Sequence, residues 1–98
     1  MKSTIKKYKI NNLNDFDLIF DELKTKTIKH NLIIDFNLID ITRLLPKILK
    51  LNDSCLQNNK SLVIVSPQNS HKIINIVPTD IEAEDIIQIE EIERDLKV

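Results

Sequence analysis

The sequence predicts an α/β domain with a single layer of mostly parallel strands, flanked by about three to four helices. Short apolar runs alternate along the chain with longer segments whose apolar residues recur at helical spacing. The connections between successive runs are too long for hairpins, which favours parallel strands joined by right-handed crossovers. A chain of 98 residues can bury one modest core, so residues 1–98 are expected to form a single domain.

The amino-terminal segment is predicted to be an edge strand followed by a helix. Residues 4–10 (TIKKYKI) place Tyr8 and Ile10 on one face, and their lysines suit a sheet edge because they discourage pairing with other chains. Asn14 is the predicted N-cap of a helix that ends near His30. The apolar positions of this helix follow the i, i+3, i+4, i+7 spacing and are Phe16, Ile19, Phe20 and Leu23.

Three further strands and one helix are predicted in the middle of the chain. Residues 31–36 (NLIIDF) and 61–65 (SLVIV) read as strands covered on both faces, because consecutive residues are large and apolar. Residues 72–77 (KIINIV) form the third. Pro46 implies that the intervening helix is regular only from about there, or has a loosened first turn. A broad apolar stripe defines this helix and consists of Ile41, Leu44, Leu45, Ile48, Leu51 and Cys55.

Residues 77–96 hold eight of the fifteen acidic residues and are predicted to form the final helix. Thr79 and Glu82 have the Thr-x-x-Glu spacing of a capping box. Carboxylates in the first turns also suit the positive end of the helix dipole. One face of this helix is expected to pack on the sheet and consists of Ala83, Ile86 and Ile87.

A second apolar face lies in the carboxyl-terminal half of the same helix. Ile89, Ile92 and Leu96 are rotated by more than a quarter turn from the first face. Two interpretations are open. The end of the chain could fold back and cover these residues, or they could form, together with Glu93, a surface for a protein partner or a second copy of the chain.

Charge and cysteine content limit the classes of partner. Residues 1–79 carry twelve Lys and Arg against seven Asp and Glu, whereas residues 80–98 carry two against eight. Only Lys6, Lys7 and Lys9 are densely grouped and aromatic residues are few, so nucleic-acid binding is not expected. A single cysteine permits no internal disulfide, and no segment has the pattern of a signal peptide or a membrane span. We therefore expect a cytoplasmic protein that binds no membrane.

The sequence contains no recognisable catalytic, cofactor-binding or metal-binding constellation. It has no glycine, which excludes Gly-rich phosphate cradles and dinucleotide fingerprints. His30 and His71 have no neighbours at metal-ligand spacing. Cys55 lies on the apolar stripe of the second helix, as expected of an inert buried thiol.

One polar loop follows the first buried strand. Asp35 ends that strand at the carboxyl edge, where open α/β sheets place their sites, and Asp40 and Thr42 follow in the next loop and helix start. Turn and cap chemistry would account for Asp40 and Thr42. The alternative is a small polar site whose threonine hydroxyl could carry a phosphate near a helix N-terminus.

The order of these elements, with NLIIDF, SLVIV and then VPTDIEAEDI, resembles the STAS domain of bacterial anti-sigma-factor antagonists and sulphate-transporter tails. The resemblance covers roughly residues 31–90. In that family a strand ends in a similar Asp, and the last helix begins with a similar Pro-Thr-x-x-Glu-Ala. The closing VPTDIEAEDIIQIEEIERDL is also similar to the ending of short bacterial STAS-like proteins, some of which carry the name ribonuclease Z. The HxHxDH zinc motif of that nuclease has no counterpart in this chain.

The resemblance implies a non-enzymatic regulatory module that binds another cytoplasmic protein. The expected contact surfaces are the loop with Asp35, Asp40 and Thr42, or the acidic final helix, or both. Antagonists of this family carry Asp-Ser-Ser-Gly, with a serine that is phosphorylated, where this chain has LIDITRLLP. Asp40 and Thr42 are therefore the only residues that could stand in for that motif. The alternative function is that of a ribonuclease Z-associated protein or accessory subunit in RNA processing.

Overall fold

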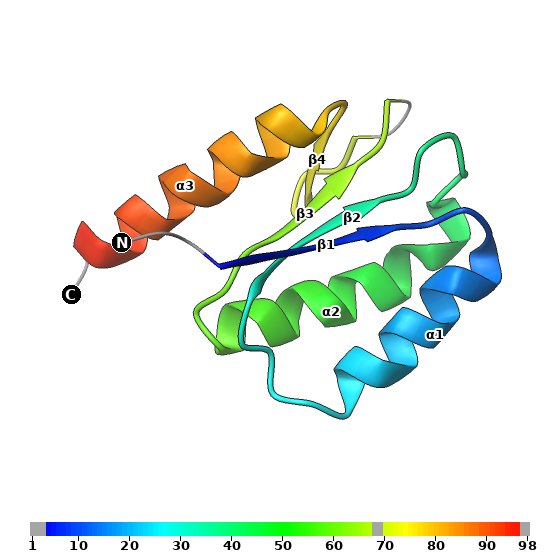
Figure 1. Ribbon diagram of the computed structural model, residues 1–98, viewed down its shortest axis with the longest axis horizontal. Helices are drawn as coiled ribbons and strands as arrows, with labels where there is room; N and C mark the ends of the chain where they lie inside the picture. Colours follow the sequence, from blue (N-terminus) through cyan, green and yellow to red (C-terminus); the bar gives the residue numbers. More distant parts are fainter. Residues whose placement is uncertain (1–3, 68–69, 97–98) are drawn as a thin grey trace.

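The computed structural model describes residues 4–67 and 70–96 and contains a four-stranded parallel sheet with three α-helices (Figure 1). The strands occur in the sheet in their order along the chain, β1-β2-β3-β4. This arrangement confirms the predicted α/β fold, and every pair of neighbouring strands is parallel. The elements are β1 (Ile5–Lys9), α1 (Leu13–Lys24), β2 (Asn31–Asp35), α2 (Leu45–Gln57), β3 (Leu62–Val65), β4 (Asn75–Val77) and α3 (Asp80–Leu96).

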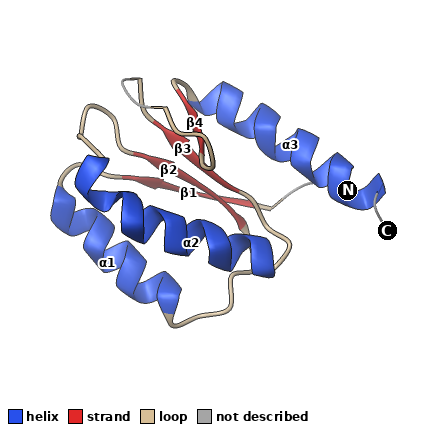
Figure 2. Ribbon diagram, turned by 180° about the vertical axis from the view of Figure 1, so that it is seen from behind, coloured by secondary structure: helices blue, strands red, loops and turns tan. Residues whose placement is uncertain are grey.

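Helices cover both faces of the sheet. α1 and α2 lie on one face and α3 lies on the other (Figure 2). The strand register aligns one residue from each strand in rows across the sheet. A row that faces α1 and α2 consists of Tyr8, Ile34, Ile64 and Ile76. The adjacent row, which faces α3, consists of Lys7, Ile33, Val63 and Asn75. β2 and β3 are therefore buried on both faces, as their continuous apolar runs predict.

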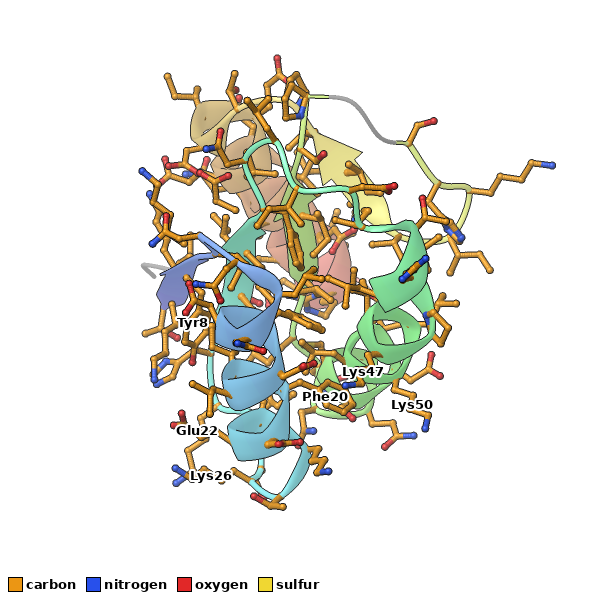
Figure 3. The ribbon with its side chains drawn as sticks, turned by 90° about the vertical axis from the view of Figure 1, so that its right-hand side faces the viewer. Tyr8, Phe20, Glu22, Lys26, Lys47 and Lys50 are labelled. Atoms are coloured by element: carbon orange, nitrogen blue, oxygen red, sulfur yellow. The ribbon has the colours of Figure 1, made fainter. Side chains whose placement is uncertain are left out.

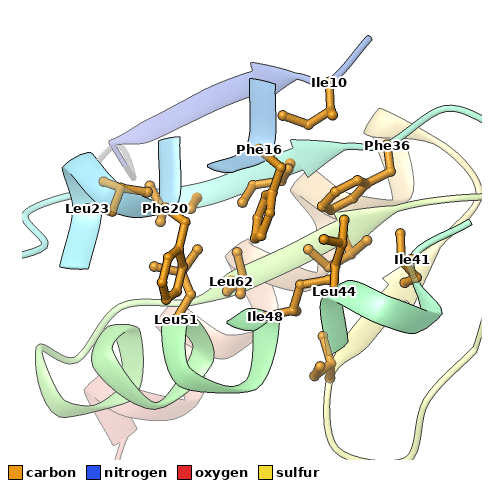
Figure 4. Packing of buried hydrophobic residues seen from close by; sticks show 14 of the residues in the cluster. Ile10, Phe16, Phe20, Leu23, Phe36, Ile41, Leu44, Ile48, Leu51 and Leu62 are labelled. Atoms are coloured by element: carbon orange, nitrogen blue, oxygen red, sulfur yellow. The ribbon is translucent and has the colours of Figure 1, made fainter. Parts of the chain in front are cut away.

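The larger core lies between the sheet and the α1–α2 layer (Figure 4). Phe16 is fully buried in it, and its ring centroid lies 5.2 Å from that of Phe36 and 6.1 Å from that of Phe20. These separations are typical of favourable aromatic pairs. Cys55 is fully buried in this core, as predicted from its place on the helix stripe.

The predicted N-cap of α1 is wrong by two residues. Asn12, rather than Asn14, caps the helix, since its side-chain oxygen accepts a hydrogen bond from the Asp15 N–H at 3.0 Å. The Asp15 carboxylate in turn accepts from the Asn11 N–H at 3.0 Å. Both asparagines are competent caps, and the returning bond from Asp15 favours the earlier one.

Two predicted boundaries also extend too far. α1 ends at Lys24 rather than near His30. The hydroxyl of Thr25, the next residue, donates a hydrogen bond to the Glu22 carbonyl at 3.1 Å. β4 has three residues rather than the predicted 72–77, because the His71 Nδ1 accepts from the N–H groups of residues 73 and 74 and holds them in a turn. By contrast, the prediction around Pro46 is confirmed, since a 3₁₀ turn (Thr42–Leu44) precedes α2.

Candidate functional site

The loop after β2 is held by side chains that bond within their own turns. The Asp35 carboxylate lies at the carboxyl edge of the sheet and accepts a hydrogen bond from the Asn37 N–H at 2.8 Å. Asn37 has a φ of 54°, in the left-handed region that asparagine tolerates better than most residues. Asp35 therefore stabilises a sharp turn directly after its strand.

Asp40 and Thr42 form a second, separate turn in the same loop. The Asp40 Oδ1 accepts from the Thr42 backbone N–H at 2.9 Å and from its hydroxyl at 2.7 Å. These two hydrogen bonds, the hydroxyl's first, hold the pKa of Asp40 below its ordinary value. The predicted turn chemistry is therefore confirmed, and both side chains are exposed at the start of the 3₁₀ turn. The loop brings Asp40 and Thr42 together, whereas Asp35 bonds to a different turn.

The predicted N-cap of α3 is confirmed. The Thr79 hydroxyl accepts from the Glu82 N–H at 3.2 Å, so Thr79 caps the first turn. Ala83 and Ile87 are fully buried against β2 and β3, and Ile86 is partly buried beside them. The prediction that the first half of the helix packs on the sheet is confirmed.

The last turns of α3 are fastened to the sheet by a polar network instead of an apolar contact. Asn31 is completely buried at the start of β2, and its Oδ1 accepts from the Ser61 N–H at 2.8 Å. The Asn31 amide donates to the Glu91 carboxylate. Arg94 donates to the Ser61 hydroxyl at 2.9 Å and lies 3.7 Å from Glu91. The network therefore joins the amino ends of two central strands to the end of the helix.

Two further contacts hold α3 on either side. Lys7 on β1 pairs with Glu84 at 2.7 Å, and this carboxylate raises the pKa of Lys7 through its hydrogen bond. Asn75 on β4 donates to Glu90 at 2.8 Å. The helix therefore bonds to the first and last strands of the sheet as well as to the middle two.

The opposite side of α3 is open to water. Its four large apolar side chains are between 55% and 79% exposed. The alternative in which the chain covers its own second apolar face is therefore wrong. We call this surface the outer face of α3; its apolar residues are Ile81, Ile89, Ile92 and Leu96, and its acidic residues are Glu82, Asp85, Glu93 and Asp95. Ile81 extends the predicted set by one residue.

Elsewhere the described residues form further grooves, one of them at the loop of His71, Lys72 and Ile73 before β4. Another lies between α1 and α2 and is lined by Phe20 and Lys24 of α1 and Lys50 of α2, of which Figure 3 labels Phe20 and Lys50. A third lies beside β1 and includes Tyr8, Glu22 and Lys26, all labelled in Figure 3. Over residues 4–67 and 70–96, no group of three or more His, Cys, Asp or Glu side chains is placed to hold a metal ion.

The second apolar face was predicted from the sequence, but the polar network of Asn31, Ser61, Glu91 and Arg94 was not. This network holds the other side of α3 against the sheet, so the second apolar face stays exposed. The available signal was a polar residue in front of each buried run, Asn31 before LIID and Ser61 before LVIV. The strand register places these two residues side by side, next to the pair formed by Leu32 and Leu62.

Comparisons with known proteins add no family. No protein-family model, curated protein or solved structure matches the chain. Within the described residues, no helix is both long and apolar enough to span a membrane.

Proposed function

We propose that this protein is a non-enzymatic, STAS-like interaction module of the cytoplasm that binds another protein through the outer face of α3. The observation that carries this proposal is the exposure of Ile89, Ile92 and Leu96 on a helix whose other side is fastened to the sheet. Contiguous exposed apolar side chains on a folded surface mark sites of protein contact more often than isolated ones do.

The helix is better supported than the loop after β2 as the contact surface. Asp35, Asp40 and Thr42 each bond within a local turn, and this accounts for their presence without a ligand. Leu38 is the only large apolar side chain in that loop that is exposed. The alternative function, that of a ribonuclease Z-associated protein or accessory subunit in RNA processing, stays a prediction from the sequence resemblance.

The test compares three forms of the full chain in affinity capture from cells, followed by titration of each identified protein against the purified forms. The double variant Ile89→Ser, Ile92→Ser removes the outer apolar surface. Leu18→Ser is the matched control, because Leu18 is 71% exposed on α1, on the opposite side of the sheet. We expect a partner that binds the natural chain and the Leu18 variant but not the double variant. A partner that binds all three equally would contradict the proposal, and so would failure of the natural chain to bind any protein.

A further inference from the structure

The proposed function does not say what kind of protein segment binds to α3. The charges on the helix limit the kinds of segment that fit. We propose that the outer face of α3 binds a basic amphipathic helix, with apolar residues along one side and lysines or arginines beside them. This inference rests on the proposed function, since it concerns the same surface. It follows from how α3 divides its charges, from the shape of its apolar surface, and from the backbone bonding along the middle of the helix.

Apart from Asp80 in the first turn, the acidic residues of α3 fall into two groups with different environments. On the inner side, Glu84, Glu90 and Glu91 bond to Lys7, Asn75 and Asn31 of the sheet. On the outer face, none of the acidic side chains has an ion-pair partner in the described part of the chain. This outer group consists of Glu82, Asp85, Glu93 and Asp95.

The outer face also lacks compensating cations along the described part of α3. Arg94 is the one cationic residue between Asp80 and Leu96, and it points inward to Ser61 and Glu91. The charged side chains that border the exposed apolar residues are therefore all negative. A surface with this charge attracts basic segments and repels acidic ones, both during encounter and in the complex.

The same charges disfavour a second copy of the chain as the occupant. A symmetric pair would place this face against itself, because each copy offers the same patch. Glu93 and Asp95 of one copy would then approach the acids of the other, and between Asp80 and Leu96 this face has no cation to separate them. Such like-charge contacts are strongly unfavourable when water is removed.

The spacing of the apolar residues favours a helix as the occupant. Ile89, Ile92 and Leu96 form a contiguous apolar stripe on one side of the helix, and Ile81 lies on the same side beyond Asp85, so the side measures about 22 Å at the α-helical rise. This surface is a straight ridge that matches the apolar stripe of a second helix. Between the first and last turns of α3 the backbone N–H and C=O groups bond within the helix, so an extended segment lying there would bury its own N–H and C=O groups without partners. A helical segment satisfies those groups internally.

The test uses synthetic peptides of about 15 residues, long enough to follow this ridge. The probe carries leucines at i, i+3, i+4 and i+7 spacing with lysines beside them. One control replaces every lysine with glutamate, and another scrambles the same residues so that no amphipathic face forms. Binding of each labelled peptide to the full chain is measured by fluorescence anisotropy at low and high salt.

We expect the basic amphipathic peptide to bind, more weakly at high salt, and both control peptides to bind at least roughly tenfold more weakly, a difference of about 1.4 kcal/mol. The double variant Ile89→Ser, Ile92→Ser should weaken binding by roughly tenfold or more, whereas Leu18→Ser leaves it unchanged. The variant Glu93→Lys, Asp95→Lys should weaken binding and reduce its salt dependence. Circular dichroism verifies that each variant is folded.

Equal binding of the scrambled or acidic peptide would overturn the inference, and so would binding that the isoleucine substitutions leave unchanged. A free chain that dimerises through Ile92, detected by sedimentation of the natural chain and the double variant, would also overturn it. The two proposals fail separately. A cellular partner that requires Ile89 and Ile92, combined with no binding of the basic peptide, leaves the proposed function intact and refutes only the partner chemistry.

Discussion

Replacing Asn31 with alanine tests whether the polar network holds the end of α3. The substitution leaves the Ser61 N–H, in a residue only 1% exposed, without its acceptor. An unsatisfied buried donor costs about 1–3 kcal/mol. The lost bond to Glu91 adds at most about 1 kcal/mol, because that carboxylate is 32% exposed and water can replace the amide. We therefore expect Asn31→Ala to lower the free energy of unfolding by about 1–4 kcal/mol, a large share of a typical domain's stability.

The measurement is urea unfolding followed by far-ultraviolet circular dichroism. Asn75→Ala is the matched control, because Asn75 also donates its amide to a glutamate of α3, Glu90, but from a partly exposed position. Its loss should be about 1 kcal/mol or less, since water can take the place of the amide. Equal losses for the two variants, or a loss below about 1 kcal/mol for Asn31→Ala, would refute the assigned role of the network.

Three further predictions concern single side chains. Ile87→Ala should lower the free energy of unfolding by about 2–5 kcal/mol because Ile87 is fully buried, whereas Ile92→Ala should change it by less than about 0.5 kcal/mol; similar urea midpoints would contradict this. Burial raises the pKa of the Cys55 thiol to about 12, so a chromogenic disulfide reagent should react with it slowly in the folded chain and rapidly in denaturant; equal rates would refute its burial. Thr42→Val removes the hydroxyl that lowers the pKa of Asp40, so that pKa should rise in an NMR titration. Because the folded pKa is depressed, Asp40 stabilises the fold above its unfolded pKa and loses this effect as the pH falls through the folded pKa. An unchanged titration would count against the hydroxyl's role.

The parts of the fold that sequence predicted well depend on local patterns. Consecutive apolar residues in NLIID and LVIV predict strands covered on both faces, and the register confirms this burial. The errors arose where two local solutions compete. Asn12 and Asn14 can each cap α1, and only the bond between Asp15 and Asn11 distinguishes them.

The candidate site also has one part that local sequence patterns predict and one part that they do not. That α3 has two apolar faces follows from helical geometry, so Ile89 and Ile92 could be placed on the second face from sequence alone. Whether this face is covered depends on which side chains meet the sheet at the end of the helix. Asn31 lies 60 residues from Glu91 and 63 from Arg94, so only the tertiary fold brings them together. The sequence offers no local spacing that would reveal such a contact.

This arrangement separates folding from binding within one helix. Ala83 and Ile87 stabilise the fold by burial, and Glu91 and Arg94 replace burial with hydrogen bonds over the last turns. The isoleucines of the outer face are therefore not needed to hold the helix in place. Since Ile92 is 59% exposed, its removal takes little apolar area out of the folded core. Any large effect of substituting Ile92 must then arise in a complex, so a variant with normal stability and lost binding would locate the contact on this face.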